Sequence, residues 1–176
     1  MTENSSKEIS IAGTLSYADF KKYNSYHRRK IVIGYFAFAF LAFFYILSNG
    51  ITSNGVSVYP LAAILSFVAS ATLTLILILL LGIRIRREFK SDQIIKNEIS
   101  YVINNEGINQ KIRRSNLFID WSDLLVAKED HDMFRLYISK NKAMILTKRF
   151  FNSTEEINTL KTLIKNNLNS KKVKLK

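Results

Sequence analysis

One uncharged stretch constrains this chain more than any other feature. Residues 31–83 contain no Asp, Glu, Lys, Arg or His, although the 176 residues include 26 Lys and Arg and 14 Asp and Glu. A soluble domain of this length distributes charges over its whole surface. A segment that crosses a bilayer instead needs about 20 consecutive, predominantly apolar residues. The stretch therefore predicts a membrane-embedded region and argues against a simple soluble basic protein.

The uncharged stretch divides into two apolar runs, at residues 31–47 (or as far as 51) and 59–83, which a polar segment separates. As helices the runs would be roughly 25 and 37 Å long, which suits a hydrocarbon core about 30 Å thick. We expect a transmembrane α-helical hairpin over residues 31–83. Buried helices of a soluble core are the alternative, but a helix that is apolar all round has no face for solvent.

Basic residues flank both runs and are absent from the segment between them. Cytoplasmic loops of membrane proteins carry an excess of Lys and Arg. We therefore expect a multi-pass protein of the inner-membrane type with both termini in the cytoplasm. The basic residues next to the runs are interpreted as membrane-surface anchors: Arg28, Arg29, Lys30, Arg84, Arg86 and Arg87.

Small residues recur every four positions along the second run, at Ala62, Ser66, Ser70 and Thr74. Such a row lies on one face of a helix and lets a neighbouring helix approach closely. We interpret it as a helix-packing face toward the first run or a second copy of the chain. A hydroxyl-lined pore in a larger oligomer is the alternative, although neither run contains an ionisable residue that would mark an ion path.

The sequence after the second run changes from helical to alternating periodicity. Strand-like segments lie at residues 99–103, 108–114, 117–128, 133–139 and 143–148. Residues 153–156 (Ser-Thr-Glu-Glu) match a capping box that starts an amphipathic helix. We expect an α+β cytoplasmic domain at residues 84–169, a bent antiparallel sheet with a C-terminal capping helix. An N-terminal cytoplasmic segment (1–30) precedes the hairpin, and a disordered basic tail (170–176) ends the chain.

No segment carries a recognisable catalytic or cofactor motif. The sequence has no P-loop, dinucleotide fingerprint, nucleophile elbow or cysteine. Residues 129–132 (Glu-Asp-His-Asp) lie at a predicted turn, where short polar residues are favoured for backbone reasons. Trp121 is interpreted as a core residue between the solvated Asp120 and Asp123. We expect no metal, no cofactor, no enzymatic activity and no nucleic-acid partner.

Two basic pairs of the predicted domain are not required by membrane topology, Arg113–Arg114 and Lys148–Arg149. Basic residues beside an anionic leaflet contribute on the order of 1 kcal/mol each. We predict that these residues contact lipid phosphates or an acidic partner. Neighbours in a strand point to opposite faces, so one residue of each pair would serve a given surface.

Several short segments follow one another along the chain in a distinctive order. Leu-Ser-Tyr-Ala-Asp-Phe (15–20) precedes the apolar runs, and the closing helix follows Glu-Gly-Ile (106–108), Trp-Ser-Asp-Leu (121–124), Phe-Arg-Leu-Tyr-Ile-Ser (134–139) and Ala-Met-Ile-Leu-Thr-Lys-Arg-Phe (143–150). This order resembles the YcxB-like family of bacterial membrane proteins. The resemblance implies a cytoplasmic domain similar to pleckstrin-homology (PH) folds and supplies no catalytic residues. Residues 146–149 read Leu-Thr-Lys-Arg where it implies Ile-Pro-Lys-Arg.

These observations together predict a non-enzymatic integral membrane protein that tethers a PH-like binding domain to the cytoplasmic face. Its expected partners are membrane lipids, in particular anionic ones, another membrane protein, or further copies of itself as a homo-oligomer. Two alternatives stay open. One is an immunity or resistance protein against a membrane-active, bacteriocin-like peptide, and the other is a subunit of an oligomeric pore or transporter.

Overall fold

The computed structural model describes residues 8–50, 58–93 and 95–176, and it divides into two compact units. The helical unit is Phe20–Ser91. The sheet unit combines the described residues up to Asp19 with Asp92–Lys176. The sheet unit is thus assembled from chain segments that precede and follow the helical unit in the sequence. The sequence patterns did not predict the N-terminal contribution.

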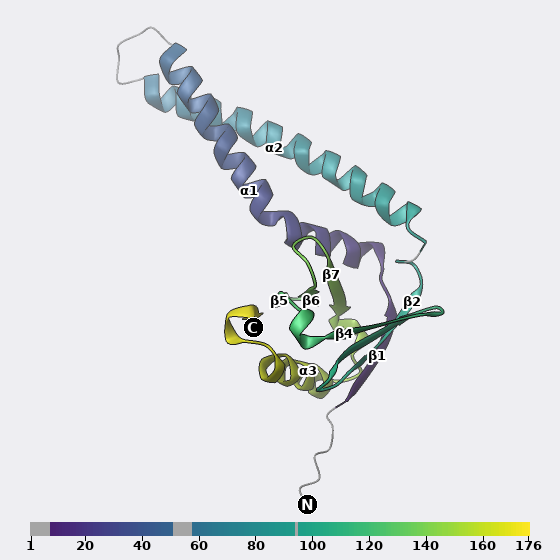
Figure 1. The fold of residues 1–176 in the computed structure, drawn as a ribbon. Coiled ribbons are helices and arrows are strands. Elements are labelled where there is room, and N and C mark those ends of the chain that lie inside the picture. Colours follow the sequence, from purple (N-terminus) through teal and green to yellow (C-terminus); the bar gives the residue numbers. More distant parts are fainter. Residues whose placement is uncertain (1–7, 51–57, 94) are drawn as a thin grey trace, which may run out of the picture. The chain divides into compact units, whose positions relative to one another are not determined.

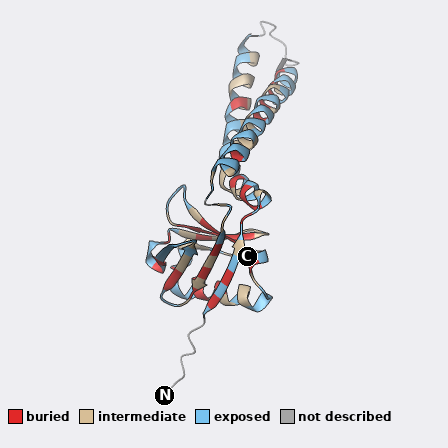
Figure 2. Cartoon of the chain, turned by 90° about the vertical axis from the view of Figure 1, so that its right-hand side faces the viewer, coloured by how far each residue is buried: buried red, intermediate tan, exposed pale blue. Residues whose placement is uncertain are grey.

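Two long helices, α1 (Tyr17–Gly50) and α2 (Val58–Ser91), have 34 residues each (Figure 1). Both extend beyond the predicted apolar runs, because the basic residues that flank the runs continue the helices. Each helix contains a window that is long and apolar enough to cross a membrane, with a mean hydropathy of 2.3 in α1 and 2.6 in α2. Only 6% and 11% of these windows are buried, and Figure 2 shows exposed residues along both helices.

The two helices contact each other at two levels. The rings of Phe36 and Phe67 meet edge to face with centroids 5.7 Å apart, and those of Phe20 and Phe89 lie 5.8 Å apart. Between these levels α1 bends, so that its N-terminal part runs back toward the C-terminal end of α2 (Figure 1).

The first sheet is antiparallel with the strand order β1-β2-β3-β4. Its strands are β1 (Ile9–Thr14), β2 (Glu98–Ile103), β3 (Gly107–Ile112) and β4 (Ser115–Asp120). Ile11 lies opposite Tyr101, and both side chains are almost fully buried. The predicted alternation at residues 99–103 is confirmed, since Ile99, Tyr101 and Ile103 all face the core.

The second sheet has the strand order β7-β6-β5-β8. Its strands are β5 (Val126–Glu129), β6 (Met133–Tyr137), β7 (Ala143–Thr147) and β8 (Val173–Lys174). The predicted hairpin formed by β6 and β7 is confirmed. The expected disorder of the tail is wrong, because β8 pairs in parallel with β5.

The expected single bent sheet is divided into two sheets by a short 3-10 helix, η1 (Trp121–Asp123). Asp120 caps η1, since its carboxylate accepts the main-chain N–H of Ser122 at 2.7 Å. Trp121 is buried, and its indole N–H donates to the carbonyl of Asn104 at 3.0 Å. Trp121 is thus a core residue between exposed aspartates, as predicted, and it lies where one sheet gives way to the other.

The C-terminal helix α3 (Thr154–Asn167) follows a second 3-10 helix, η2 (Lys148–Phe150). Ser153 caps α3 by accepting the main-chain N–H of Glu156 at 3.2 Å, as predicted. The other half of the predicted capping box differs, because the Glu156 carboxylate accepts from the main-chain N–H of Asn152 at 2.8 Å. Leu160, Leu163 and Ile164 bury the apolar face of this helix.

Candidate functional site

The first predicted basic pair forms a turn instead of lying in a strand. Arg113 and Arg114 connect β3 to β4, in which Ile112 lies opposite Ser115. Arg113 has a φ of 54°, a left-handed conformation that glycine usually supplies in two-residue hairpin turns. Its Nε donates to Asn97 Oδ1 at 2.8 Å. The prediction that these two residues point to opposite faces of a strand is therefore wrong.

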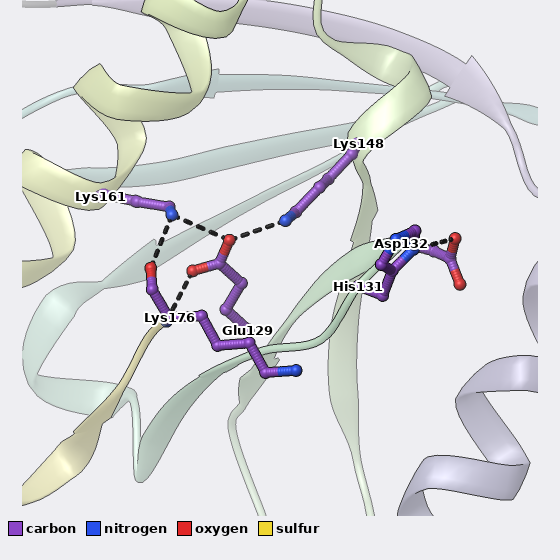
Figure 3. A network of polar contacts seen from close by, with 6 residues as sticks. All are labelled: Glu129, His131, Asp132, Lys148, Lys161 and Lys176. Carbon is purple, nitrogen blue, oxygen red and sulfur yellow. Dashed lines mark hydrogen bonds and ion pairs between the residues drawn. The ribbon is translucent and has the colours of Figure 1, made fainter.

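Lys148 of the second pair belongs to a network around a buried carboxylate, Glu129 (Figure 3). One carboxylate oxygen of Glu129 accepts from Lys148 Nζ at 2.7 Å and from Lys161 Nζ at 2.9 Å. The other accepts from the main-chain N–H of Lys176 at 2.8 Å. Burial raises the pKa of Glu129, but the hydrogen bonds from Lys148, Lys161 and Lys176 outweigh it and lower this pKa below 4.5.

Arg149, the other member of that pair, is bound to the N-terminal part of the sheet unit. Its guanidinium contacts the Asp19 carboxylate at 2.6 Å and donates to the carbonyl of Thr14. Asp19 also accepts from the main-chain N–H and the hydroxyl of Ser16. Burial raises the pKa of Asp19, but the bonds from Arg149 and Ser16 lower it overall. Both members of the second pair thus take part in ion pairs inside the sheet unit.

The acidic cluster at residues 129–132 is also divided among structural contacts. Asp130 accepts from Arg135 Nε at 2.6 Å, and Arg135 donates in addition to the hydroxyl of Tyr137 at 2.9 Å. His131 is exposed and contacts Asp132. Within the described residues, no group of three His, Cys, Asp or Glu side chains is arranged to hold a metal ion.

The helical unit contains a cleft of about 480 Å³ between α1 and α2 that the sequence patterns did not predict. Its lining from α1 follows one helix face, with polar residues first and apolar ones after them: Lys21, Asn24, Ser25, Arg28, Arg29, Val32 and Ile33. The lining from α2 has the same spacing and is wholly apolar: Ile78, Leu81, Gly82 and Ile85. The recurrence at i, i+3, i+4 and i+7 is the sequence signal that could have predicted it.

The predicted membrane-surface anchors differ in their relation to this cleft. Arg28 and Arg29 line it, whereas Lys30 on α1 and the α2 residues Arg84, Arg86 and Arg87 do not. All of them lie in the portions of α1 and α2 next to the apolar windows. The helices therefore present basic side chains both inside the cleft and around it.

The small residues of α2 lie against protein, whereas most of their apolar neighbours are exposed. Ala62, Ser66 and Ser70 are fully buried and Thr74 nearly so. The hydroxyls donate to carbonyls of their own helix, for example Ser66 to Ala62 at 2.6 Å and Thr74 to Ser70 at 2.7 Å. Their hydrogen atoms are therefore already bonded, which suits a helix-packing face better than a pore lining.

The fold and the cleft define a class of protein: two membrane-length apolar helices joined to a sheet-rich unit with a C-terminal helix. The sequence model of the family described as YcxB-like protein matches residues 103–164. The "Uncharacterized protein YcxB" of Bacillus subtilis (strain 168) is 29% identical over 183 residues, covering 100% of this chain and 98% of that protein. No solved structure matches the chain. The two matches support the YcxB-like family, as the order of the sequence segments indicated.

Proposed function

We propose that this chain is an integral protein of the bacterial cytoplasmic membrane that holds its sheet unit at the cytoplasmic face as a binding module. The observation that carries the proposal is the exposure of the two apolar windows, of which only 6% and 11% are buried. Exposed apolar surface of this extent is costly in water and favourable in hydrocarbon. The helical unit therefore suits a bilayer as its solvent.

The charge distribution supports the proposed orientation. Basic residues occupy the N-terminal part of α1 and the C-terminal part of α2, and residues 31–83 between them are uncharged. An anionic leaflet attracts such residues with about 1 kcal/mol each. Because both ends of the hairpin carry them, the same leaflet faces both ends, and the sheet unit lies on the cytoplasmic side.

The sheet unit supports a binding role more than a catalytic one. Its charged clusters at Glu129, Asp19 and Arg135 are joined in internal ion pairs that tie strands and helices together. The order of four antiparallel strands, three further antiparallel strands and a helix also supports the PH-like relationship. Of the two predicted basic pairs, the exposed turn at Arg113 and Arg114 is the better candidate for contact with an acidic surface.

Membrane integration is tested by washing membranes that contain the full chain with alkaline carbonate. The protein should stay in the membrane pellet, because each apolar window is more stable in hydrocarbon than in water. A charged residue at the centre of a span costs about 3 kcal/mol, so Phe38→Arg combined with Leu73→Arg should release or degrade the protein. Ser91→Arg combined with Gln93→Arg adds the same charge outside the windows and should change nothing. Release of the unmodified chain would contradict integration.

A further inference from the structure

The cleft between α1 and α2 is lined by cations of α1 and by apolar residues of both helices. Lys21, Arg28 and Arg29 supply three cations, and the lining contains no Asp or Glu. Within the described residues, none of the three has an ion-pair partner. The cleft is therefore positively charged and complementary to an anion.

Apolar residues complete the lining. α1 contributes Val32 and Ile33, and α2 contributes Ile78, Leu81 and Ile85. The lining from Ile85 to Ile78 extends roughly 10 Å along the helix axis. A ligand that fits this lining carries both an anionic group and an apolar chain.

Gly82 leaves additional room on the apolar α2 side of the cleft. A Cβ atom at this position would meet nothing within 4 Å, although the residue lines the cleft. Glycine in a helix interior is about 1 kcal/mol less favourable than alanine. The side-chain space that glycine gives up here is available to an acyl chain.

We propose that this cleft binds one anionic phospholipid of the cytoplasmic leaflet. The phosphate lies between Lys21, Arg28 and Arg29, and an acyl chain follows Ile85, Gly82 and Ile78. The volume of about 480 Å³ lies within the range of small-ligand sites. Basic pockets between membrane helices on the cytoplasmic side are known to take anionic headgroups. The inference rests on the proposed function, because it requires both helices to lie in the membrane.

The test is native mass spectrometry of the full chain in detergent, titrated separately with phosphatidylglycerol and phosphatidylcholine. The chain should bind one phosphatidylglycerol in preference to phosphatidylcholine. Arg28→Gln combined with Arg29→Gln should weaken this binding roughly 30-fold, since each arginine contributes about 1 kcal/mol. Arg86→Gln combined with Arg87→Gln removes the same charge from outside the cleft and should leave the binding unchanged.

A second pair of variants tests the apolar part of the lining. Gly82→Leu should fill the cleft and reduce the occupancy by phosphatidylglycerol at least several-fold. Gly34→Leu, where a new side chain also meets nothing within 4 Å but does not line the cleft, should have no effect. Glycerol 3-phosphate, which has the phosphate without acyl chains, should not displace the lipid.

Three results would overturn the inference: equal binding of both lipids, equal losses in the cleft variants and their controls, or displacement by glycerol 3-phosphate. The carbonate wash is repeated for every variant. A chain that stays in the membrane but fails to select phosphatidylglycerol removes the lipid site and leaves the proposed function intact. A chain that leaves the membrane contradicts the proposed function itself.

Discussion

Thr147 occupies the position where the family resemblance implies proline. Its φ of −72° lies in the range that proline imposes, and η2 begins immediately after it. Threonine therefore occupies the conformation of the proline that the family resemblance implies. The hydroxyl of Thr147 is buried and has no hydrogen-bond partner in the described part of the chain.

Replacing that hydroxyl should stabilise the sheet unit. Thr147→Val keeps the branched shape and removes an unsatisfied buried polar group, which should raise the free energy of unfolding by about 1 kcal/mol. Trp121, the one tryptophan of the sequence, lies buried in the sheet unit and reports its unfolding by fluorescence. Thr159→Val is the control, because the hydroxyl of Thr159 bonds to Glu155 and lies near the surface. A loss of stability in Thr147→Val would show that its hydroxyl is bonded.

At the scale of elements, Glu129 joins β5 to η2, α3 and the C-terminal strand region through the contacts of Lys148, Lys161 and Lys176. The folded-state pKa of Glu129 is lowered, so ionised Glu129 stabilises the fold above pH 4.5, its ordinary value. That contribution is lost as the pH falls below 4.5 through the lowered pKa of the folded state.

Glu129→Gln should therefore destabilise the sheet unit near neutral pH by about 1.5–3 kcal/mol, the range for hydrogen bonds to charged groups. The difference from the unmodified chain should shrink as the pH is lowered below 4.5, which thermal unfolding monitored by Trp121 fluorescence between pH 3 and 7 can measure. Glu106→Gln, in an exposed turn, is the control. A destabilisation that is independent of pH would contradict the ionised network.

The sequence predicted most elements and the hairpin of β6 and β7, but not how the other elements associate. Alternating residues identified β2, β6 and β7, and the Ser153 cap identified the start of α3, because these signals are local. β1 was missed since Ile9–Thr14 pairs with a strand some ninety residues later, a contact that no local pattern records. The cleft was missed for a related reason: the spacing of its lining marks one face on each helix, but no local pattern records that the two faces lie opposite each other.

At the scale of the whole molecule, the sheet unit is complete only with its N-terminal strand. Thr14 lies opposite Glu98, so the ends of β1 and β2 are adjacent although α1 and α2 separate them in the chain. Ile9 and Ile11 of β1 are buried, as is Leu15 just after it. A fragment that starts after α2 would lack this strand and expose the edge of β2.

A shortened chain can test this assembly. Residues 8–19 joined by a short Gly-Ser linker to residues 92–176 should give a soluble, cooperatively unfolding protein. Residues 92–176 alone should be less stable by several kcal/mol, because burial of each isoleucine contributes about 1.5–3 kcal/mol. Urea unfolding followed by Trp121 fluorescence compares the two. Equal stability of both proteins would contradict the role of β1.

The sidedness of the helical hairpin in living cells tests the proposed topology most directly. The sequence contains no cysteine, so Ser53→Cys and Asn141→Cys each introduce one unique label site. A membrane-impermeant maleimide should label position 53, between the two apolar runs, in intact cells. It should label position 141, in the turn between β6 and β7, only after permeabilisation. Labelling of both positions in intact cells, or of neither before permeabilisation, would contradict a hairpin that crosses the membrane with its sheet unit inside.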